Sequence, residues 1–148
     1  RLNCPDIYYL ICGKGPLKNE LVKLVNDLGV QSKVKFLGFV DDISQIYPMI
    51  DVLVFPSKQE GLSVALMEAM AAGCPCLASR IRGNTDLLDD EELFSLTDNE
   101  ELIEKLIKIF EDRNLLVNMS KKNRDKIQKY DAKIIKEKMR NIYQNVHN

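Results

Sequence analysis

Residues 51–79 read DVLVFPSKQEGLSVALMEAMAAGCPCLAS, and this stretch decides the fold. The apolar run 52–55 ends at Pro56 and predicts a short buried strand. Residues 63–72 have the length and composition of a helix that Gly73 ends, and 76–78 predict a second strand. Two apolar strands joined through a helix are typical of a parallel sheet that helices cover on both faces.

The same alternation continues on both sides of this stretch. Upstream, strands are predicted at 7–12 and 34–37, with a helix over 17–28 and a short helix over 43–47 that Asp41 or Asp42 caps. Downstream, a weak strand at 93–96 precedes helices through 102–110 (capped by Asp98 or Asn99), 115–130 and 132–146. We therefore predict one α/β domain over 1–148, a doubly wound, Rossmann-like parallel sheet with C-terminal helices over about 99–146. Its ligands should lie beyond the carboxyl ends of the strands.

Composition excludes several classes of protein. The chain has 148 residues and a net charge of −1, so it presents no general basic field for nucleic acid. No apolar run reaches the roughly 18 residues of a membrane span, and the start does not resemble a signal peptide. The spacing of Cys74 and Cys76 does not fit a zinc or redox pair, and the single histidine is His147. We expect all four cysteines (Cys4, Cys12, Cys74 and Cys76) to be small buried residues of a protein in a reducing cytosol.

Glu68 is the one charged residue between Gly61 and Ser79. Its helix is apolar on nearly every side, which predicts a buried helix. A buried carboxylate costs several kcal/mol unless a polar group meets it. The hydroxyls of a sugar or ribose diol would do so, and a buried ion pair or a capping role is the alternative.

The loop from Glu60 to Ser63 precedes this helix. Free main-chain N–H groups and the helix dipole favour an anion such as a diphosphate there, and Gly61 allows close approach. A diphosphate at the helix start and a diol at Glu68 together describe a nucleotide sugar, although two glutamates at this spacing are also common in ordinary helices. Two further segments follow strands. Residues 13–15 (Gly-Lys-Gly) form a nucleotide-binding turn or a plain tight turn, and an arginine in 80–84 neutralises a phosphate or lies in a solvated loop.

The sequence resembles the C-terminal, nucleotide-sugar-binding domain of glycosyltransferase family 4, retaining enzymes with the GT-B fold. The matching blocks are residues 11–16, 34–38, 51–57, 60–75 and 82–84, and they include Glu60-x7-Glu68 followed by Ala-Met-Ala-x-Gly-x-Pro. The Ile-Arg-Gly-Asn at 81–84 is similar to the branch that builds bacterial capsule, exopolysaccharide or lipopolysaccharide. Thr85 and Asp86 depart from that branch, which weakens a phosphate role for this loop.

The resemblance implies transfer of a sugar from a UDP- or GDP-sugar to a saccharide or lipid-linked acceptor, without metal or cofactor. It assigns Glu60 to the donor sugar as the candidate catalytic residue, Glu68 to the ribose, and the main chain of Leu62 and Ser63 to the distal phosphate. The candidate donor-binding residues are Gly13, Gly15, Phe39, Val40, Gly61, Leu62, Ser63, Glu68, Arg82, Gly83 and Asn84, of which Phe39 and Val40 should border the base.

The chain opens with Arg1 and not Met, so we expect it to be part of a longer protein. The resemblance places a diphosphate-gripping basic pair and an acceptor-binding N-terminal domain before Arg1, so the chain alone should have little transferase activity. It also directs the apolar side of the last helix toward that domain. The lysines of 121–138 suit contact with the inner face of an anionic membrane, or a solvated helix face in the cytoplasm.

Two other functions compete with this interpretation. A receiver-like, non-catalytic nucleotide-binding module would need a lysine at a later strand end, and none follows Ala78. A GT-B sugar-nucleotide epimerase would need carboxylates and histidines in its cleft, which only a second domain could supply here.

Overall fold

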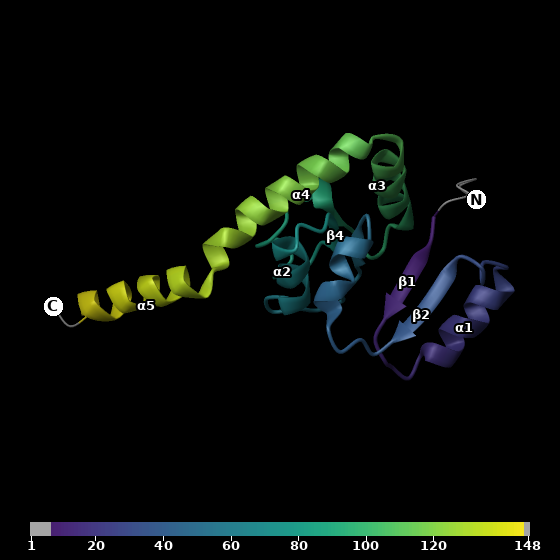
Figure 1. Ribbon diagram of the computed structural model, residues 1–148, viewed down its shortest axis with the longest axis horizontal. Helices are drawn as coiled ribbons and strands as arrows, with labels where there is room; N and C mark the ends of the chain where they lie inside the picture. Colours follow the sequence, from purple (N-terminus) through teal and green to yellow (C-terminus); the bar gives the residue numbers. More distant parts are fainter. Residues whose placement is uncertain (1–6, 147–148) are drawn as a thin grey trace. The chain divides into compact units, whose positions relative to one another are not determined.

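The computed structural model describes residues 7–146 (Figure 1). Contacts divide the chain into two compact units, one up to Ile43 and one from Ser44 onward, and each is described by itself. All strand pairs in both units are parallel; α-helices connect the strands of the first two pairs along the chain, and a loop with a 3-10 turn connects the strands of the third. The predicted α/β class with parallel sheets is confirmed.

The first unit is a strand–helix–strand element. It consists of β1 (Tyr9–Cys12), α1 (Lys18–Asp27) and β2 (Val34–Gly38). The register shifts by one residue near the end of β1, so that Cys12 lies opposite Gly38. Gly13 and Gly38 both have positive φ, and the Gly13 N–H donates to the Gly38 carbonyl at 2.6 Å. The two strands therefore end side by side in tight glycine turns.

The second unit contains a three-stranded sheet in the order β3 (Leu53–Phe55), β4 (Cys76–Ser79), β5 (Leu93–Phe94). Helix α2 (Val64–Ala71) connects β3 to β4. Every residue of the central strand β4 is buried, as its uninterrupted apolar sequence predicts. Leu77, Phe94 and Ile109 form a core cluster, against which partly buried side chains of β3, α3 and α4 pack.

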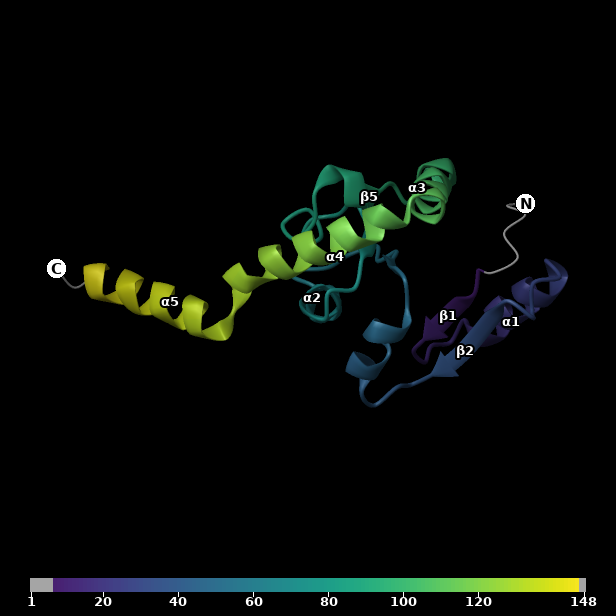
Figure 2. The ribbon, with the colours of Figure 1, turned by 45° about the horizontal axis from the view of Figure 1, so that its top comes forward.

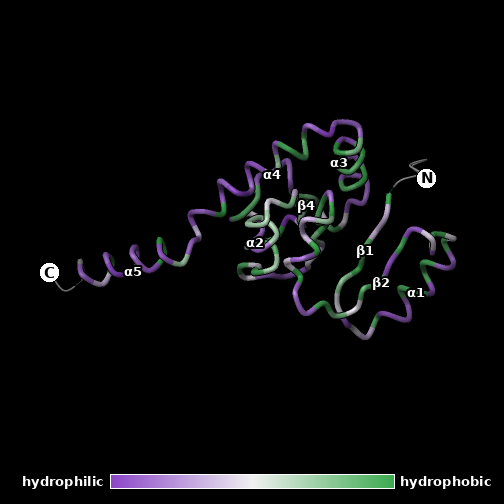
Figure 3. The backbone as a smooth tube through the Cα atoms, viewed as in Figure 1, coloured by the Kyte–Doolittle hydropathy of each residue, from purple (hydrophilic) through white to green (hydrophobic). Residues whose placement is uncertain are grey.

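Three helices follow the sheet: α3 (Asn99–Glu111), α4 (Arg113–Ile127) and α5 (Ala132–Val146). Asp98 caps α3 by accepting from the N–H groups of Glu100 and Glu101, and Asp112 caps α4 by accepting from the Asn114 N–H. Polar and apolar residues alternate along these helices (Figure 3). Figure 2 shows α5 continuing beyond α4, and its described side chains are all exposed. None of the described helices has the length and apolar character needed to cross a bilayer.

Four 3-10 turns complete the secondary structure of the described residues. They are η1 (Ile43–Gln45), η2 (Tyr47–Met49), η3 (Asp90–Glu92) and η4 (Gln128–Tyr130). The short helix predicted over 43–47 is therefore wrong, because the segment forms two separate turns. Pro48 lies in the first turn of η2 and has no N–H to continue a regular helix.

The expectation that the cysteines are buried holds for two of the three described. Cys74 and Cys76 are buried, whereas Cys12 is exposed, so the prediction for Cys12 was wrong. Cys12 ends β1, which pairs with a single strand among residues 7–146, so little of the described structure covers it. Cys4 and His147 lie outside the described residues.

Helix α4 is attached to the sheet through polar contacts as well as apolar packing. It runs beside α2 (Figure 1), and the buried Asn123 amide donates to the Cys74 carbonyl at 2.8 Å. Asp89, at the start of η3, forms ion pairs with Lys122 and Lys126 of α4. Hydrogen bonds from Lys122 first, and then Lys126, lower the pKa of Asp89 to about 2.

We predict that these ion pairs make the free energy of unfolding depend on pH in the acidic range. Since the folded-state pKa of Asp89 lies below the usual 3.8, its contribution is present above about pH 4 and is lost as pH falls through 2. The Asp89 side chain is 46% exposed, so solvent screening limits that contribution to about 0.5–1 kcal/mol. Asp89→Asn should lower the free energy of unfolding by this amount at pH 7, as measured by urea denaturation. It should also reduce the loss of stability that the wild type shows between pH 4 and 2.

Asp125→Asn is the matched control, because Asp125 also lies on the surface of this unit but forms no ion pair with a described residue. An equal effect of the two substitutions would show that the Asp89 ion pairs do not stabilise the fold.

Candidate functional site

The loop after β3 ends at the first turn of α2. Ser63 is the N-cap, with its Oγ accepting from the Leu66 N–H at 3.2 Å. In the part of the chain that the structure describes, the N–H groups of Val64 and Ala65 have no hydrogen-bond partner. The helix therefore begins with unpaired main-chain donors and the positive end of its dipole, which is the arrangement that binds anions.

The loop after β4 packs directly on this first loop. Gly83 is buried with φ +93°, and a Cβ built on it would overlap the carbonyl oxygen of Gly61. Ser79, the last residue of β4, donates its hydroxyl to the Ser57 carbonyl at 2.5 Å. The structure thus joins two segments that the sequence predicted to follow neighbouring parallel strands.

Asn84 braces these loops from within. Its side chain is fully buried, and its Nδ2 donates to the Ser79 carbonyl at 2.9 Å and to the Ser79 Oγ at 3.3 Å. The amide nitrogen of this candidate donor-binding residue is thus used within the protein, whereas its buried Oδ1 has no hydrogen-bond partner among the described residues. The main chain of Asn84 is also used within the protein, because its N–H donates to the Ile81 carbonyl and its carbonyl accepts from the N–H groups of Leu87 and Leu88.

Glu68 is exposed, so the expectation of a buried carboxylate was wrong. Helix α2 buries Leu66, Ala69 and Met70, while Val64 and Glu68, one turn apart, lie on its exposed side. The apolar residues on that side are small or lie at the helix end, so an apolar sequence did not mean burial. No described residue hydrogen-bonds the Glu68 carboxylate, which is available to a ligand.

The remaining candidates of this unit differ in their partners. Glu60 is partly buried, and its Oε1 accepts from the Ser57 hydroxyl at 2.8 Å. Leu62 is exposed beside it. Arg82 is exposed too, and no acidic side chain within residues 7–146 pairs with it, so its charge is free to meet an anion.

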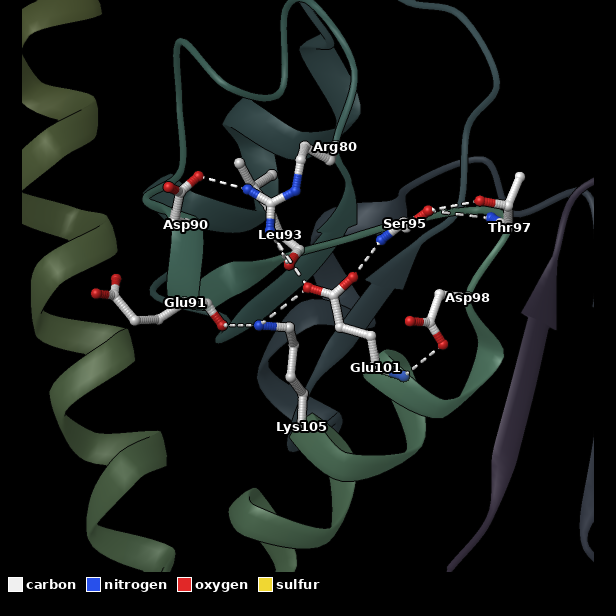
Figure 4. A network of polar contacts seen from close by, with 9 residues as sticks. All are labelled: Arg80, Asp90, Glu91, Leu93, Ser95, Thr97, Asp98, Glu101 and Lys105. Atoms are coloured by element: carbon white, nitrogen blue, oxygen red, sulfur yellow. Dashed lines mark hydrogen bonds and ion pairs between the residues drawn. The ribbon is translucent and has the colours of Figure 1, made fainter.

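Arg80 is committed to a network within the protein (Figure 4). Its guanidinium contacts Asp90 at 2.5 Å, and it also reaches the Leu93 carbonyl and Glu101 Oε1, both at 3.2 Å. Arg80 therefore holds α3 against the end of β5 instead of serving a phosphate. Sequence reasoning did not predict this network, although Glu101 three residues after the cap Asp98 is a typical helix-start pattern.

Glu101 is the centre of the network in Figure 4. Its Oε2 accepts from the Ser95 N–H at 2.7 Å, and Lys105 lies 3.6 Å from its Oε1. The Ser95 N–H first, then Arg80 and Lys105, hold the pKa of Glu101 below its usual range, so the carboxylate stays ionised.

The first unit brings its own candidates together at the ends of β1 and β2. Gly13 and Gly15 form the turn after β1, and a Cβ added at either would meet no atom of the described residues within 4 Å. Phe39 follows β2 and is 62% exposed, and the Lys14 ammonium lies 5.3 Å from the centroid of its ring. Val40 is partly buried next to it. This unit therefore presents an exposed aromatic face beside a glycine turn.

Comparison with known proteins gives the family. A family model described as "Glycosyl transferases group 1" matches residues 1–126. The chain belongs to this family. Among its curated relatives are bacterial transferases. The UDP-Gal:alpha-D-GlcNAc-diphosphoundecaprenol alpha-1,3-galactosyltransferase of Escherichia coli is 36% identical over 127 residues, which cover 83% of this chain and 33% of the relative.

The O-antigen biosynthesis glycosyltransferase WclY of Escherichia coli is 29% identical over 148 residues, covering 96% of this chain and 39% of WclY. The fold is also that of Anabaena HepE, solved in complex with UDP-glucose, with a TM-score of 0.85 and 23% identity over 96% of this chain and 42% of HepE. The group 1 chain thus spans between a third and two fifths of the length of the two Escherichia coli relatives.

We predict that Gly83→Ala opens the contact between the two loops of the second unit. Positive φ and the approach of the Gly61 oxygen both disfavour a Cβ, for a combined cost of about 2–4 kcal/mol in the free energy of unfolding. Urea denaturation of the purified protein measures it. Gly61→Ala is the control, because a Cβ there would meet no atom within 4 Å. Equal stability of both variants would show that the loop contact is not tight.

Proposed function

We propose that this group 1 chain is the donor-binding domain of a retaining glycosyltransferase. The enzyme would transfer a sugar from a UDP- or GDP-sugar to a saccharide or lipid-linked acceptor. One observation carries the proposal: the two interlocked loops place unpaired N–H groups at the start of α2, and Glu68 lies exposed one turn along the same helix.

The diphosphate of the donor would bind at the start of α2. The N–H groups of Val64 and Ala65, with the main chain of Leu62 and Ser63, supply donors, and the helix dipole adds positive potential. As the sugar leaves, negative charge grows on the distal phosphate, and donors fixed in advance stabilise it without reorganisation. The free guanidinium of Arg82 supports the same charge, so the proposal needs no metal ion.

Glu68 would hold the ribose of the nucleotide. Val64 and Glu68 are four residues apart and lie on one side of α2, so a molecule seated at the helix start extends toward the Glu68 carboxylate. Two adjacent hydroxyls donate to the two oxygens of one carboxylate. An exposed carboxylate with no protein partner suits this role better than a buried one, because binding does not have to break an ion pair.

Glu60 would face the donor sugar. It lies at the start of the loop on which Gly61 and Gly83 meet, so it belongs to the same surface as the proposed diphosphate site. For the first unit by itself, we propose that exposed Phe39 and partly buried Val40 border a nucleotide base, and that the turn at Gly13 and Gly15 lets a ligand approach the main chain.

The relatives support the class of donor and acceptor. The name of the Escherichia coli galactosyltransferase gives a UDP-sugar donor and a diphosphoundecaprenol-linked acceptor, and HepE was solved with UDP-glucose. We propose accordingly that the protein carrying this chain works in polysaccharide synthesis at the cytoplasmic face of the membrane, and that a further domain of it binds the acceptor.

Titration calorimetry of the purified protein with UDP and with GDP tests the proposal and identifies the base. Glu68→Ala should weaken binding of the preferred nucleotide about tenfold or more, because a charged acceptor of two hydroxyls is lost. Glu104→Ala, an exposed glutamate of α3 without a partner among the described residues, is the matched control and should bind as the wild type does. Wild-type affinity in Glu68→Ala would remove Glu68 from the ribose role, and failure to bind either nucleotide would contradict the proposed function.

A further inference from the structure

Glu60 has a carboxylate whose direction the local backbone does not fix. It lies between β3 and α2, outside any helix or strand, and its side chain has three rotatable bonds. A group that must meet a reacting sugar has to be held within a fraction of an ångström. Some neighbour must therefore restrict this side chain.

Ser57 is the one described residue that hydrogen-bonds the Glu60 carboxylate. Its hydroxyl lies 2.8 Å from Glu60 Oε1 and 3.3 Å from the Gln59 carbonyl, and it has a single proton to donate. The ionised acceptor is both nearer and stronger, so the proton goes to Glu60. The bond leaves Oε2 of Glu60 without a donor among the described residues and directs the carboxylate from one side.

The main chain of Ser57 is itself held from the neighbouring strand. The Ser79 hydroxyl donates to the Ser57 carbonyl at 2.5 Å, and Ser79 is fully buried. The Asn84 amide donates to the Ser79 carbonyl at 2.9 Å and to its Oγ at 3.3 Å. Each donor in this series has its acceptor, and the series runs from the loop after β4, through the end of β4, to the loop after β3.

We infer that Ser57 is a positioning residue that orients the Glu60 carboxylate toward the donor sugar, and that Ser79 and Asn84 hold Ser57 in place for this task. The inference rests on the proposed function in one respect, namely that Glu60 faces the sugar. It extends the proposed function by distinguishing contacts that bind the nucleotide from a contact that acts on the sugar. The helix start and Glu68 recognise the nucleotide, whereas Ser57 acts only on recognition of the sugar.

The first experiment needs no ligand. Side-chain NMR couplings of Glu60 should report one rotamer in the wild type and in Ser57→Thr, which keeps the hydroxyl, and averaged rotamers in Ser57→Ala. Ser120→Ala is the control, since it removes a serine hydroxyl from α4 and leaves both loops unchanged. A single Glu60 rotamer in Ser57→Ala overturns the inference, whatever the protein binds.

The second experiment compares UDP-glucose with UDP by calorimetry on the purified protein, with GDP-mannose and GDP as the alternative pair. Ser57→Ala should weaken binding of the nucleotide sugar about threefold to tenfold and leave binding of the free nucleotide unchanged. Ser57→Thr should recover most of this loss. In a Glu60→Gln background, Ser57→Ala should have little additional effect, because the charged acceptor is already gone.

The outcomes separate the inference from the proposed function. If the wild type binds the nucleotide and Ser57→Ala weakens the binding of UDP and of UDP-glucose equally, Ser57 has a structural role only and the inference is overturned. The inference would also be overturned if the losses of UDP-glucose binding free energy in Ser57→Ala and Glu60→Gln were fully additive in the double variant. Absence of all nucleotide binding in the wild type would contradict the proposed function, and with it the orientation toward a donor sugar, whereas the NMR result would still decide whether Ser57 orders Glu60.

Discussion

The approach of the Gly83 backbone to the Gly61 carbonyl is the constraint on which the rest of the site depends. Parallel pairing of β3 with β4 brings the ends of both strands to one edge of the sheet, but pairing alone leaves the loops beyond them free. Contact between two main chains, possible only without a Cβ at Gly83, fixes the first loop against the second. The start of α2 is thereby held at a set place relative to the sheet.

Side chains add a second level of order to this main-chain contact. Ser79 and Asn84 are both fully buried; the Asn84 amide nitrogen donates to Ser79, and the Ser79 hydroxyl donates to the Ser57 carbonyl. Buried hydrogen bonds of this kind contribute modestly when complete, yet loss of one member leaves its partner unpaired in a low dielectric. Solvent-exposed side chains here, such as those of Arg82 and Glu68, form no hydrogen bond or ion pair within residues 7–146. The site therefore divides into a buried frame and an exposed surface.

The order of helices and strands could be predicted from sequence, since it depends on local periodicity. The apolar runs located all five described strands, Ala132–Val146 forms a helix over the predicted range, and α3 is capped by Asp98, one of the two predicted caps. The candidates that follow β3 and β4 also lie in adjoining loops, because parallel strands end at the same edge of a sheet. The first group of successes comes from rules that act over a few residues, and the last from the one long-range rule that parallel strands share a sheet edge.

Features that depend on distant contacts could not be predicted. Alanine-rich α2 gives no signal of which side is covered, so Glu68 was expected to be buried although it is exposed. Asn84 is a polar residue in a loop at the ligand-binding edge of the sheet, which predicted a ligand contact. Only its hydrogen bond to Ser79 in the folded structure shows that its side chain is buried. Because no described residue relies on the Glu68 carboxylate, its replacement removes a ligand contact without disturbing the frame beneath it. Loss of recognition and loss of folding are therefore separable at this position, so a variant there can report on binding while the protein remains folded.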